Sequence, residues 1–463
     1  MSGLLRKKIV TEQPPQQRLA RTLSWPHLVA LGVGAIVGTG ILTLIGVGAD
    51  RAGPAVILSF AIAGAICACA ALAYAEMATM IPASGSAYTY SYVVLGELIA
   101  WVIGWSLILE YSLVVSTVAV GWSGYIYPLL EPFGFPQWLA AGPPLGGVVN
   151  APAVFIIFVV AGLLTLGTKE SATLNALLVL VKIVALAVFV AVALPQFDAA
   201  NLQPFSPFGF AKHVSPDGVE RGVMAAAAII FFAFYGFDAI STAAEEAKNP
   251  GRDLAIGIVG SMLACVLIYM LVAVTAVGAL SYTSFADSPE PLALILRGIG
   301  QPEFATFLAI SAVIALPTVI LGFLFGQSRI FFVMARDGLL PASLARVSSR
   351  GSPARITWLT AVLVAIVAGL MPIDAIAALA NAGTLAAFVA VCVCMLVMRR
   401  RAPDAPRSFR TPLAPLVGTI GIVGCIYLFF SLPSQTQGYF LIWNLLGLIV
   451  YFAYARSRAL ADG

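Results

Sequence analysis

Long apolar runs, separated by short polar connections, follow one another along nearly the whole chain. Each run is about 20 residues long, which is the length that an α-helix needs to cross the hydrocarbon core of a bilayer. Twelve such runs begin near Leu28, Pro54, Leu98, Ala151, Leu174, Val223, Ile256, Phe304, Ile356, Ile376, Leu413 and Tyr439. The longest connection, residues 195–222, leaves no room for a soluble domain. The pattern therefore predicts an all-α integral membrane protein with twelve transmembrane helices.

The composition excludes a soluble globular protein. Of the 463 residues, 60% are hydrophobic and only 10% are charged, whereas an average soluble domain has about 25% charged residues. The six cysteines fall inside apolar runs without a CxxC pair, and the chain has only two histidines. We therefore predict no metal centre, no redox dithiol and no cofactor. The net charge of +4 gives no reason to expect a nucleic-acid partner.

The positive residues predict the orientation in the membrane. If both termini lie on one side, that side carries 20 Lys and Arg residues and the other side carries 4, with Lys182 inside a run. Positive residues are enriched on the cytoplasmic side of membrane proteins, so we expect both termini in the cytoplasm. Residues 1–27 are polar and basic and show no signal-peptide pattern. Tryptophans near the run ends are predicted to anchor the protein at the membrane interface, namely Trp25, Trp101, Trp138 and Trp358.

The first run contains a cluster of glycines near the middle of its path through the bilayer. The four glycines are Gly32, Gly34, Gly38 and Gly40, and Thr39 lies between the last two. Each interior glycine costs up to about 1 kcal/mol of helix stability relative to alanine. Gly34 and Gly38 alone would fit a GxxxG packing motif. The Thr39–Gly40 pair that follows favours a break in the helix instead.

The sixth run is interrupted in the same way, because Gly236 and Asp238 stand within an otherwise apolar stretch. If the twelve runs divide as five, five and two, the first and sixth runs hold corresponding positions. A repeat of five helices places the second repeat upside down relative to the first. Paired interruptions in corresponding helices are typical of a transporter binding site.

These positions predict five parts of the chain. They are a cytoplasmic N-terminal arm (1–27), a first five-helix repeat (28–195), a second five-helix repeat (196–400, with an external loop at 196–222), helices eleven and twelve (401–454) and a cytoplasmic tail (455–463).

A broken helix offers receptors for both charges of a zwitterion. The backbone groups freed by the break cannot face hydrocarbon, so they must line a polar cavity. The half-helix that starts after the break presents unpaired N–H groups to a carboxylate, and the half-helix that ends before it presents carbonyls to an ammonium. An α-amino acid carries both groups, which makes it the predicted ligand.

Three ionisable residues lie inside the predicted spans, where a charge costs at least about 2.5–3.5 kcal/mol. Lys182 could snorkel to the interface, but a buried ammonium could also exchange a proton during transport. Glu110 and Asp238 could each pair with Lys182, bind a cationic side chain or accept from a neighbouring hydroxyl. Glu76 lies near the cytoplasmic end of the second run and is predicted to be interfacial rather than substrate-binding.

The chain resembles the amino acid–polyamine–organocation (APC) superfamily of amino acid permeases, most closely the bacterial twelve-span form of the cationic amino acid transporter branch. The resemblance covers about residues 19–451 and depends on five stretches, 32–41, 52–60, 74–88, 236–250 and 336–341. It implies a LeuT-like five-plus-five inverted repeat with broken helices 1 and 6, plus two C-terminal helices. Leu42 and Ala255 depart from the residues usual in the family.

The resemblance also implies roles for individual residues. Lys182 is implied to couple transport to protons, and Phe232 is implied to act as a gate. The residues implied to bind the substrate are Val37, Gly38, Thr39, Gly40, Ile41, Glu110, Phe232, Tyr235, Gly236 and Asp238.

The expected function is secondary active, proton-coupled uptake of L-amino acids across the cytoplasmic membrane, with a preference for cationic amino acids as one option. The partners are thus an L-amino acid, protons and the lipid bilayer. A proton-independent exchanger and a receptor that binds without transport are the alternatives. A membrane-embedded enzyme is not predicted, because no nucleophile–base or metal constellation is present in the spans.

Overall fold

The structure is a computed structural model that describes residues 6–8, 23–83, 85–165, 172–244, 247–345 and 354–456. Most of the predicted N-terminal arm and cytoplasmic tail lies outside these residues, as do Lys169 and Glu245.

The described chain is built almost entirely from helices. Their bounds are α1 (Trp25–Ile36), α2 (Thr39–Leu42), α3 (Leu44–Ala52), α4 (Val56–Met80), α5 (Ser86–Val94), α6 (Glu97–Leu130), α7 (Ala151–Thr165), α8 (Ala172–Ala193), α9 (Val223–Ile230), α10 (Asp238–Thr242), α11 (Pro250–Ala279), α12 (Pro291–Gly298), α13 (Pro302–Ala315), α14 (Pro317–Arg336), α15 (Ala354–Leu370), α16 (Ile373–Arg401), α17 (Ala414–Ser431) and α18 (Ser434–Val450). Strand β1 (His213–Val214) pairs antiparallel with β2 (Glu220–Arg221) in the predicted external loop.

Every predicted apolar run coincides with a helix of the structure. Among the described residues, ten helical segments are long and apolar enough to cross a membrane, and α7 and α15 are shorter apolar helices. The shorter connections contain two helices that the hydropathy pattern did not predict, α5 and α12. The prediction of an all-helical, multi-pass membrane protein is therefore confirmed.

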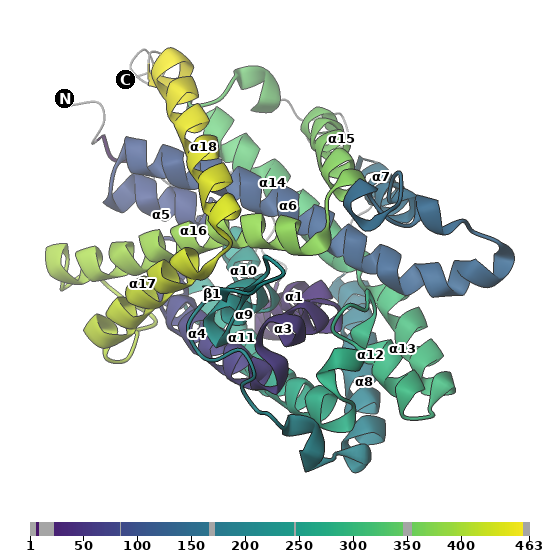
Figure 1. The fold of residues 1–463 in the computed structure, drawn as a ribbon. Coiled ribbons are helices and arrows are strands. Elements are labelled where there is room, and N and C mark those ends of the chain that lie inside the picture. Colours follow the sequence, from purple (N-terminus) through teal and green to yellow (C-terminus); the bar gives the residue numbers. More distant parts are fainter. Residues whose placement is uncertain are drawn as a thin grey trace.

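Helix α1 lies near the centre of the bundle (Figure 1). It packs against α8, α11 and α14, and α4 packs against α9, α11 and α16. The long helix α6 contacts α14 and α16. The last two helices, α17 and α18, lie at one edge of the bundle, and α7 and α15 lie at another (Figure 1). Both interrupted segments, α1–α2 and α9–α10, are consequently surrounded by protein.

Ion pairs connect the external loop to the helices beneath it. Arg221 pairs with Asp50 at 3.1 Å and with Asp217 at 2.5 Å, and Arg51 pairs with Asp374 at 3.3 Å. The guanidinium of Arg221 donates to Asp217 and lowers the pKa of that carboxyl. Arg221 thus attaches the loop to the end of α3, and Arg51 joins α3 to the start of α16.

One predicted membrane anchor is wrong. Trp101 is fully buried, and its indole N–H donates to the Gly447 carbonyl at 2.8 Å. It also stacks on Trp105 at a centroid distance of 5.6 Å. An indole near the end of an apolar run can face either lipid or a neighbouring helix, and here it packs against α18. Trp25, Trp138 and Trp358 are between 42% and 54% exposed, in keeping with their predicted surface positions.

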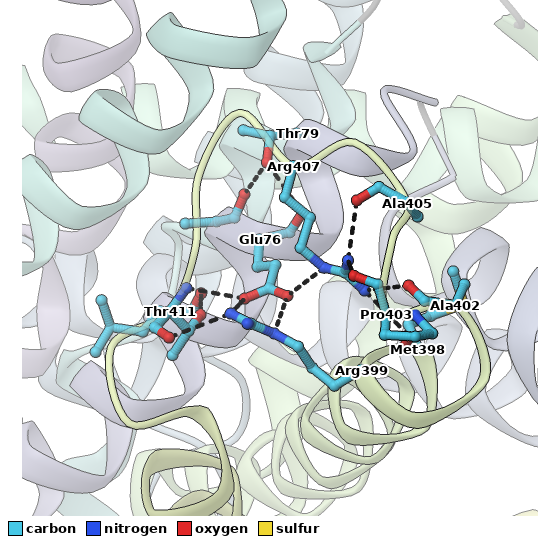
Figure 2. Close-up of polar contacts among 11 residues, drawn as sticks. Glu76, Thr79, Met398, Arg399, Ala402, Pro403, Ala405, Arg407 and Thr411 are labelled. Carbon is cyan, nitrogen blue, oxygen red and sulfur yellow. Dashed lines mark hydrogen bonds and ion pairs between the residues drawn. The ribbon is translucent and has the colours of Figure 1, made fainter.

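Glu76 lies near the end of α4, as predicted, but its side chain is only 1% exposed and faces neighbouring protein. Arg399 at the end of α16 donates to both carboxylate oxygens at 2.7 Å. Arg407 donates from Nε at 3.1 Å, and the backbone N–H of Thr411 donates at 2.8 Å (Figure 2). We call these four residues the Glu76 cluster. It joins α4 to the connection between α16 and α17.

Replacing Glu76 by Gln should reduce stability by about 1–3 kcal/mol. The neutral amide would place N–H donors against two guanidinium groups, and Arg407 is itself only 1% exposed. Thermal unfolding of the detergent-solubilised protein measures the effect. Glu303, exposed in the first turn of α13, gives the control Glu303→Gln, which should leave the midpoint nearly unchanged. Equal midpoints for the two variants would contradict a stabilising role for the Glu76 cluster.

Candidate functional site

The first predicted break is present at Val37 and Gly38. Helix α1 ends at Ile36, the backbone is extended at Val37 (φ −72°, ψ 99°) and Gly38 (φ −157°), and α2 begins at Thr39. Because α2 starts here, the N–H groups of its first turn have no carbonyl one turn earlier to bond. Thr39, Gly40 and Ile41 therefore lie at the start of a half-helix, as the glycine cluster predicted.

The second predicted break is present in the sixth apolar run. Helix α9 ends at Ile230, residues Phe231–Ala233 form one 3₁₀ turn, and α10 begins at Asp238. Gly236 has φ +122°, a conformation that side chains other than glycine rarely adopt. Its N–H donates to Asp238 Oδ1 at 3.0 Å. The glycine and the aspartate thus form the turn that restarts the helix.

The two breaks cross each other at backbone contact. A Cβ added at Gly40 would lie 2.3 Å from Ala233 Cα, and one added at Gly236 would lie 2.9 Å from the Ala35 carbonyl carbon. Gly32, which was not part of the predicted packing pair, lies against α11, where a Cβ would meet Ser261 Oγ at 2.5 Å. The structure therefore brings the two predicted substrate segments together.

Side chains from neighbouring helices donate to carbonyls near the ends that the breaks expose. Lys182 on α8 donates to the Gly34 carbonyl at 2.8 Å, and the Tyr269 hydroxyl on α11 donates to the Ile36 carbonyl at 2.7 Å. Lys182 is 3% exposed. A cation is stabilised at the C-terminal end of a helix by the helix dipole. Lys182 therefore stabilises the end of α1 directly, and its ammonium lies within the bundle rather than at the interface.

Of the alternatives for Asp238, the hydroxyl partner is the one observed. Asp238 Oδ2 accepts from the Tyr111 hydroxyl at 2.9 Å, and Asp238 is 1% exposed. Tyr111 lies on α6, so this hydrogen bond connects α10 to the long helix beside it. Both carboxylate oxygens of Asp238 thus have protein donors.

Glu110 has no such partner. Both of its carboxylate oxygens are buried without a hydrogen bond to any described residue. A Cβ added at Gly383 on α16 would lie 3.1 Å from Glu110 Cβ. Thr39, in contrast, packs against Gly121, which is eleven residues further along α6, or roughly 16 Å. Glu110 and the residue that contacts Thr39 therefore lie at separate levels along α6.

Aromatic side chains cover the unwound part of the sixth run. Phe232 packs edge-on against Tyr235 at a centroid distance of 5.0 Å, and Tyr235 faces Phe323 of α14 at 6.5 Å. The Tyr235 hydroxyl is buried without a hydrogen-bond partner in the described part of the chain. Gly38 lies against Val319 of α14, since an added Cβ would be 3.3 Å from that side chain. Apolar walls and unpartnered polar groups thus occur together at the breaks.

Three residues at the site were not predicted, namely Tyr111, Tyr269 and Asn381. Asn381 had a weaker signal in the sequence, because a polar amide within an apolar span often hydrogen-bonds to a neighbouring helix. Tyr111 and Tyr269 had none, since a tyrosine in an apolar helix is most often a packing residue.

Two helices that break inside a membrane bundle and cross at their breaks define a multi-pass membrane protein with the architecture of a transporter. Comparison with known sequences gives the family. A model of the amino acid permease family matches residues 23–453, and the chain belongs to this family, within the APC superfamily.

Three relatives illustrate the range of the family. The chain is 42% identical to the branched-chain amino acid permease BcaP of Bacillus subtilis (strain 168), over 99% of this chain and 98% of that protein. It is 41% identical to the methylthioribose transporter of the same bacterium, over the full length of both. It is 38% identical to the vacuolar cationic amino acid transporter 4 of Arabidopsis thaliana, over 87% of this chain and 68% of that protein. The resemblance found in the sequence is therefore confirmed at the level of the family.

Proposed function

We propose that this protein takes up L-amino acids across the cytoplasmic membrane by proton-coupled secondary transport. It does so through twelve transmembrane helices arranged as a five-plus-five inverted repeat with two additional helices, and both termini are cytoplasmic. The observation that carries the proposal is the crossing of the two breaks, Gly40 on Ala233 and Gly236 on Ala35. The names of the permease and transporter relatives agree with an amino acid as the substrate.

The amino acid would bind between the two breaks. Its carboxylate would accept from the first N–H groups of α2 at Thr39, Gly40 and Ile41, next to Val37 and Gly38. Its ammonium would donate to carbonyls of the unwound segment near Tyr235 and Gly236. Phe232, at the surface of that segment, would close over the ligand.

Lys182 would provide the coupling. In the protonated form, its ammonium donates to the Gly34 carbonyl and holds the end of α1. Loss of the proton removes the charge from that end and weakens the attachment. The position of α1 thus becomes linked to protonation, which is what a proton symporter requires. An exchanger without proton coupling would not need a titratable residue here.

Glu110 would extend the site for long basic substrates. Its carboxylate is buried and has no hydrogen-bond donor among the described residues, so a cationic side chain would supply one. Glu110 lies roughly 16 Å along α6 from the Thr39 contact, which is farther than the side chain of lysine or arginine extends. A basic ligand at Glu110 would therefore have its carboxylate nearer to the unwound segment of the sixth run than to Thr39. Asp238 would remain bound to Tyr111.

Ligand-induced thermal stabilisation of the purified protein tests the substrate. We expect stabilisation by L-amino acids and none by methylthioribose, which has neither a carboxylate nor an ammonium. Glu110→Gln should weaken arginine, lysine and ornithine binding by about tenfold, because it removes one charged hydrogen bond of about 1.5 kcal/mol or more. It should leave alanine and leucine nearly unchanged.

Two outcomes would contradict these assignments. Stabilisation by methylthioribose but by no amino acid would remove the proposed substrate class. Equal weakening of arginine and alanine by Glu110→Gln would remove the role of Glu110 in recognising basic side chains. Binding without accumulation in proteoliposomes would instead indicate a receptor.

A further inference from the structure

The side chain of Asn381 contacts the end of α9 and has no role in the transport mechanism proposed above. It is on α16 and is fully buried. Its Nδ2 donates to the Ala228 carbonyl at 2.7 Å and to the Ile229 carbonyl at 3.0 Å. Both carbonyls belong to the last turn of α9, directly before the interruption.

The Ala228 carbonyl is among those that a helix leaves unpaired where it ends, and the Ile229 carbonyl accepts only from the N–H of Phe231, two residues on. In an uninterrupted α-helix, they would accept from the N–H groups of Phe232 and Ala233. One amide side chain on another helix donates to both. The opposite orientation of the amide would place its oxygen against two carbonyl oxygens, so the donating orientation is the only favourable one. Asn381 therefore stabilises the end of α9 and the break that follows it.

Lys182 has the same relation to the other interrupted helix. It lies on α8, in the fifth predicted span, and donates to the Gly34 carbonyl near the end of α1. Asn381 lies on α16, in the tenth predicted span, and donates near the end of α9. Spans five and ten hold corresponding positions in a five-plus-five repeat. Each helix that ends at a break thus accepts hydrogen bonds from another helix. The donor to α1 is Lys182, which can release a proton, and the donor to α9 is Asn381, which cannot.

We propose that Asn381 is a positioning residue for the substrate site, and that it holds the carbonyl end of α9 so that the unwound segment 234–237 keeps its binding geometry. This rests on the proposed function, because the segment is assigned there to the substrate. The hydrogen bonds from Asn381 to α9 then do not depend on pH, whereas the hydrogen bond from Lys182 to α1 depends on the protonation of Lys182.

Asn381→Asp tests this role because the two side chains have nearly the same shape. An ionised carboxylate cannot donate, whereas a protonated carboxyl can donate one hydrogen bond. At about pH 8 we expect the variant to bind amino acids at least about tenfold more weakly than the unmodified protein, because at most one of the two hydrogen bonds remains. At about pH 5, where a buried carboxyl is protonated and can donate one of them, part of this loss should be recovered. Asn381→Leu should bind weakly at both pH values.

Asn444 on α18 provides a matched control. Its Nδ2 donates to the Phe440 carbonyl of its own helix at 3.0 Å and its Oδ1 accepts from Ser106 Oγ at 3.2 Å, so it hydrogen-bonds to neither broken helix. Asn444→Asp should therefore bind amino acids as the unmodified protein does, at both pH values. If Asn381→Asp behaved like Asn444→Asp, the proposal would be overturned.

Hydrogen exchange of the ligand-free protein gives a readout that does not depend on the substrate. Asn381→Asp at about pH 8 should increase exchange in the peptides covering residues 226–237, relative to Asn444→Asp. Unchanged exchange would overturn the positioning role even where amino acids bind. If exchange increases in Asn381→Asp but the unmodified protein binds no amino acid, the positioning role of Asn381 is supported and the proposed substrate is wrong. Asn381→Ser, which retains one donor, should give an intermediate increase and serves if the aspartate variant does not fold.

Discussion

Replacing Lys182 by Met should reduce pH-gradient-driven uptake of amino acids by about 100-fold in proteoliposomes. The change removes a charged hydrogen bond to the Gly34 carbonyl, and such bonds contribute up to about 3 kcal/mol. It also removes the proton-carrying group of the proposed coupling. Uptake should be measured with and without an imposed pH gradient.

The Lys182→Arg variant separates the two roles of this side chain. Arginine can donate to the Gly34 carbonyl but does not release its proton at physiological pH. We therefore expect Lys182→Arg to bind amino acids and to exchange them across the membrane, while the pH gradient no longer drives accumulation. If Lys182→Arg and Lys182→Met both retained gradient-driven uptake, proton coupling through Lys182 would be disproved.

Replacing Gly40 by Ala should abolish amino acid binding. The added Cβ would lie 2.3 Å from Ala233 Cα and 3.0 Å from Ala233 N, so the backbone of one broken helix would have to move away from the other. Neither helix can move in this way without changing the distance between the half-helix ends that we assign to the substrate. Thermal stabilisation by a saturating amino acid measures the loss, and size-exclusion chromatography shows whether the variant remains folded.

Gly322→Ala is the matched control for this substitution. Gly322 also lies in a membrane helix, α14, but an added Cβ would meet no atom within 4 Å. Its replacement should leave ligand-induced stabilisation unchanged. Binding by Gly40→Ala at the affinity of the unmodified protein would show that the close crossing of the two helices is not required.

The sequence was most informative where it departs from the hydrophobic pattern. Glycines and an aspartate within apolar runs weaken a helix at identifiable residues, so the breaks at Val37–Gly38 and before Asp238 could be predicted. Lys182 was detectable because a charge is costly in hydrocarbon. All three features follow from the energetics of a single helix in a membrane.

Contacts between helices could not be predicted in the same way. The hydrogen bond from Tyr111 to Asp238 depends on how α6 and α10 pack, and neither residue specifies the other. The burial of Trp101 against α18 has the same origin, because an indole at a span end packs equally well against lipid or protein. Glu76 was placed correctly at the end of its span, but its two arginine partners come from 323 and 331 residues further along the chain.

The Glu76 cluster determines which part of the bundle can act as a pivot. Charged hydrogen bonds from two arginines fasten the end of α4 to the end of α16 and the connection after it. Among the described residues, one side-chain hydrogen bond, from Tyr111 to Asp238, attaches α10 to α6. The bond from Tyr111 to the Asp238 carboxylate is also charge-assisted, but it is one bond against the four that Glu76 accepts. On the side of the protein where the Glu76 cluster lies, a passage should therefore open between α10 and α6, with the α4–α16 junction as its hinge.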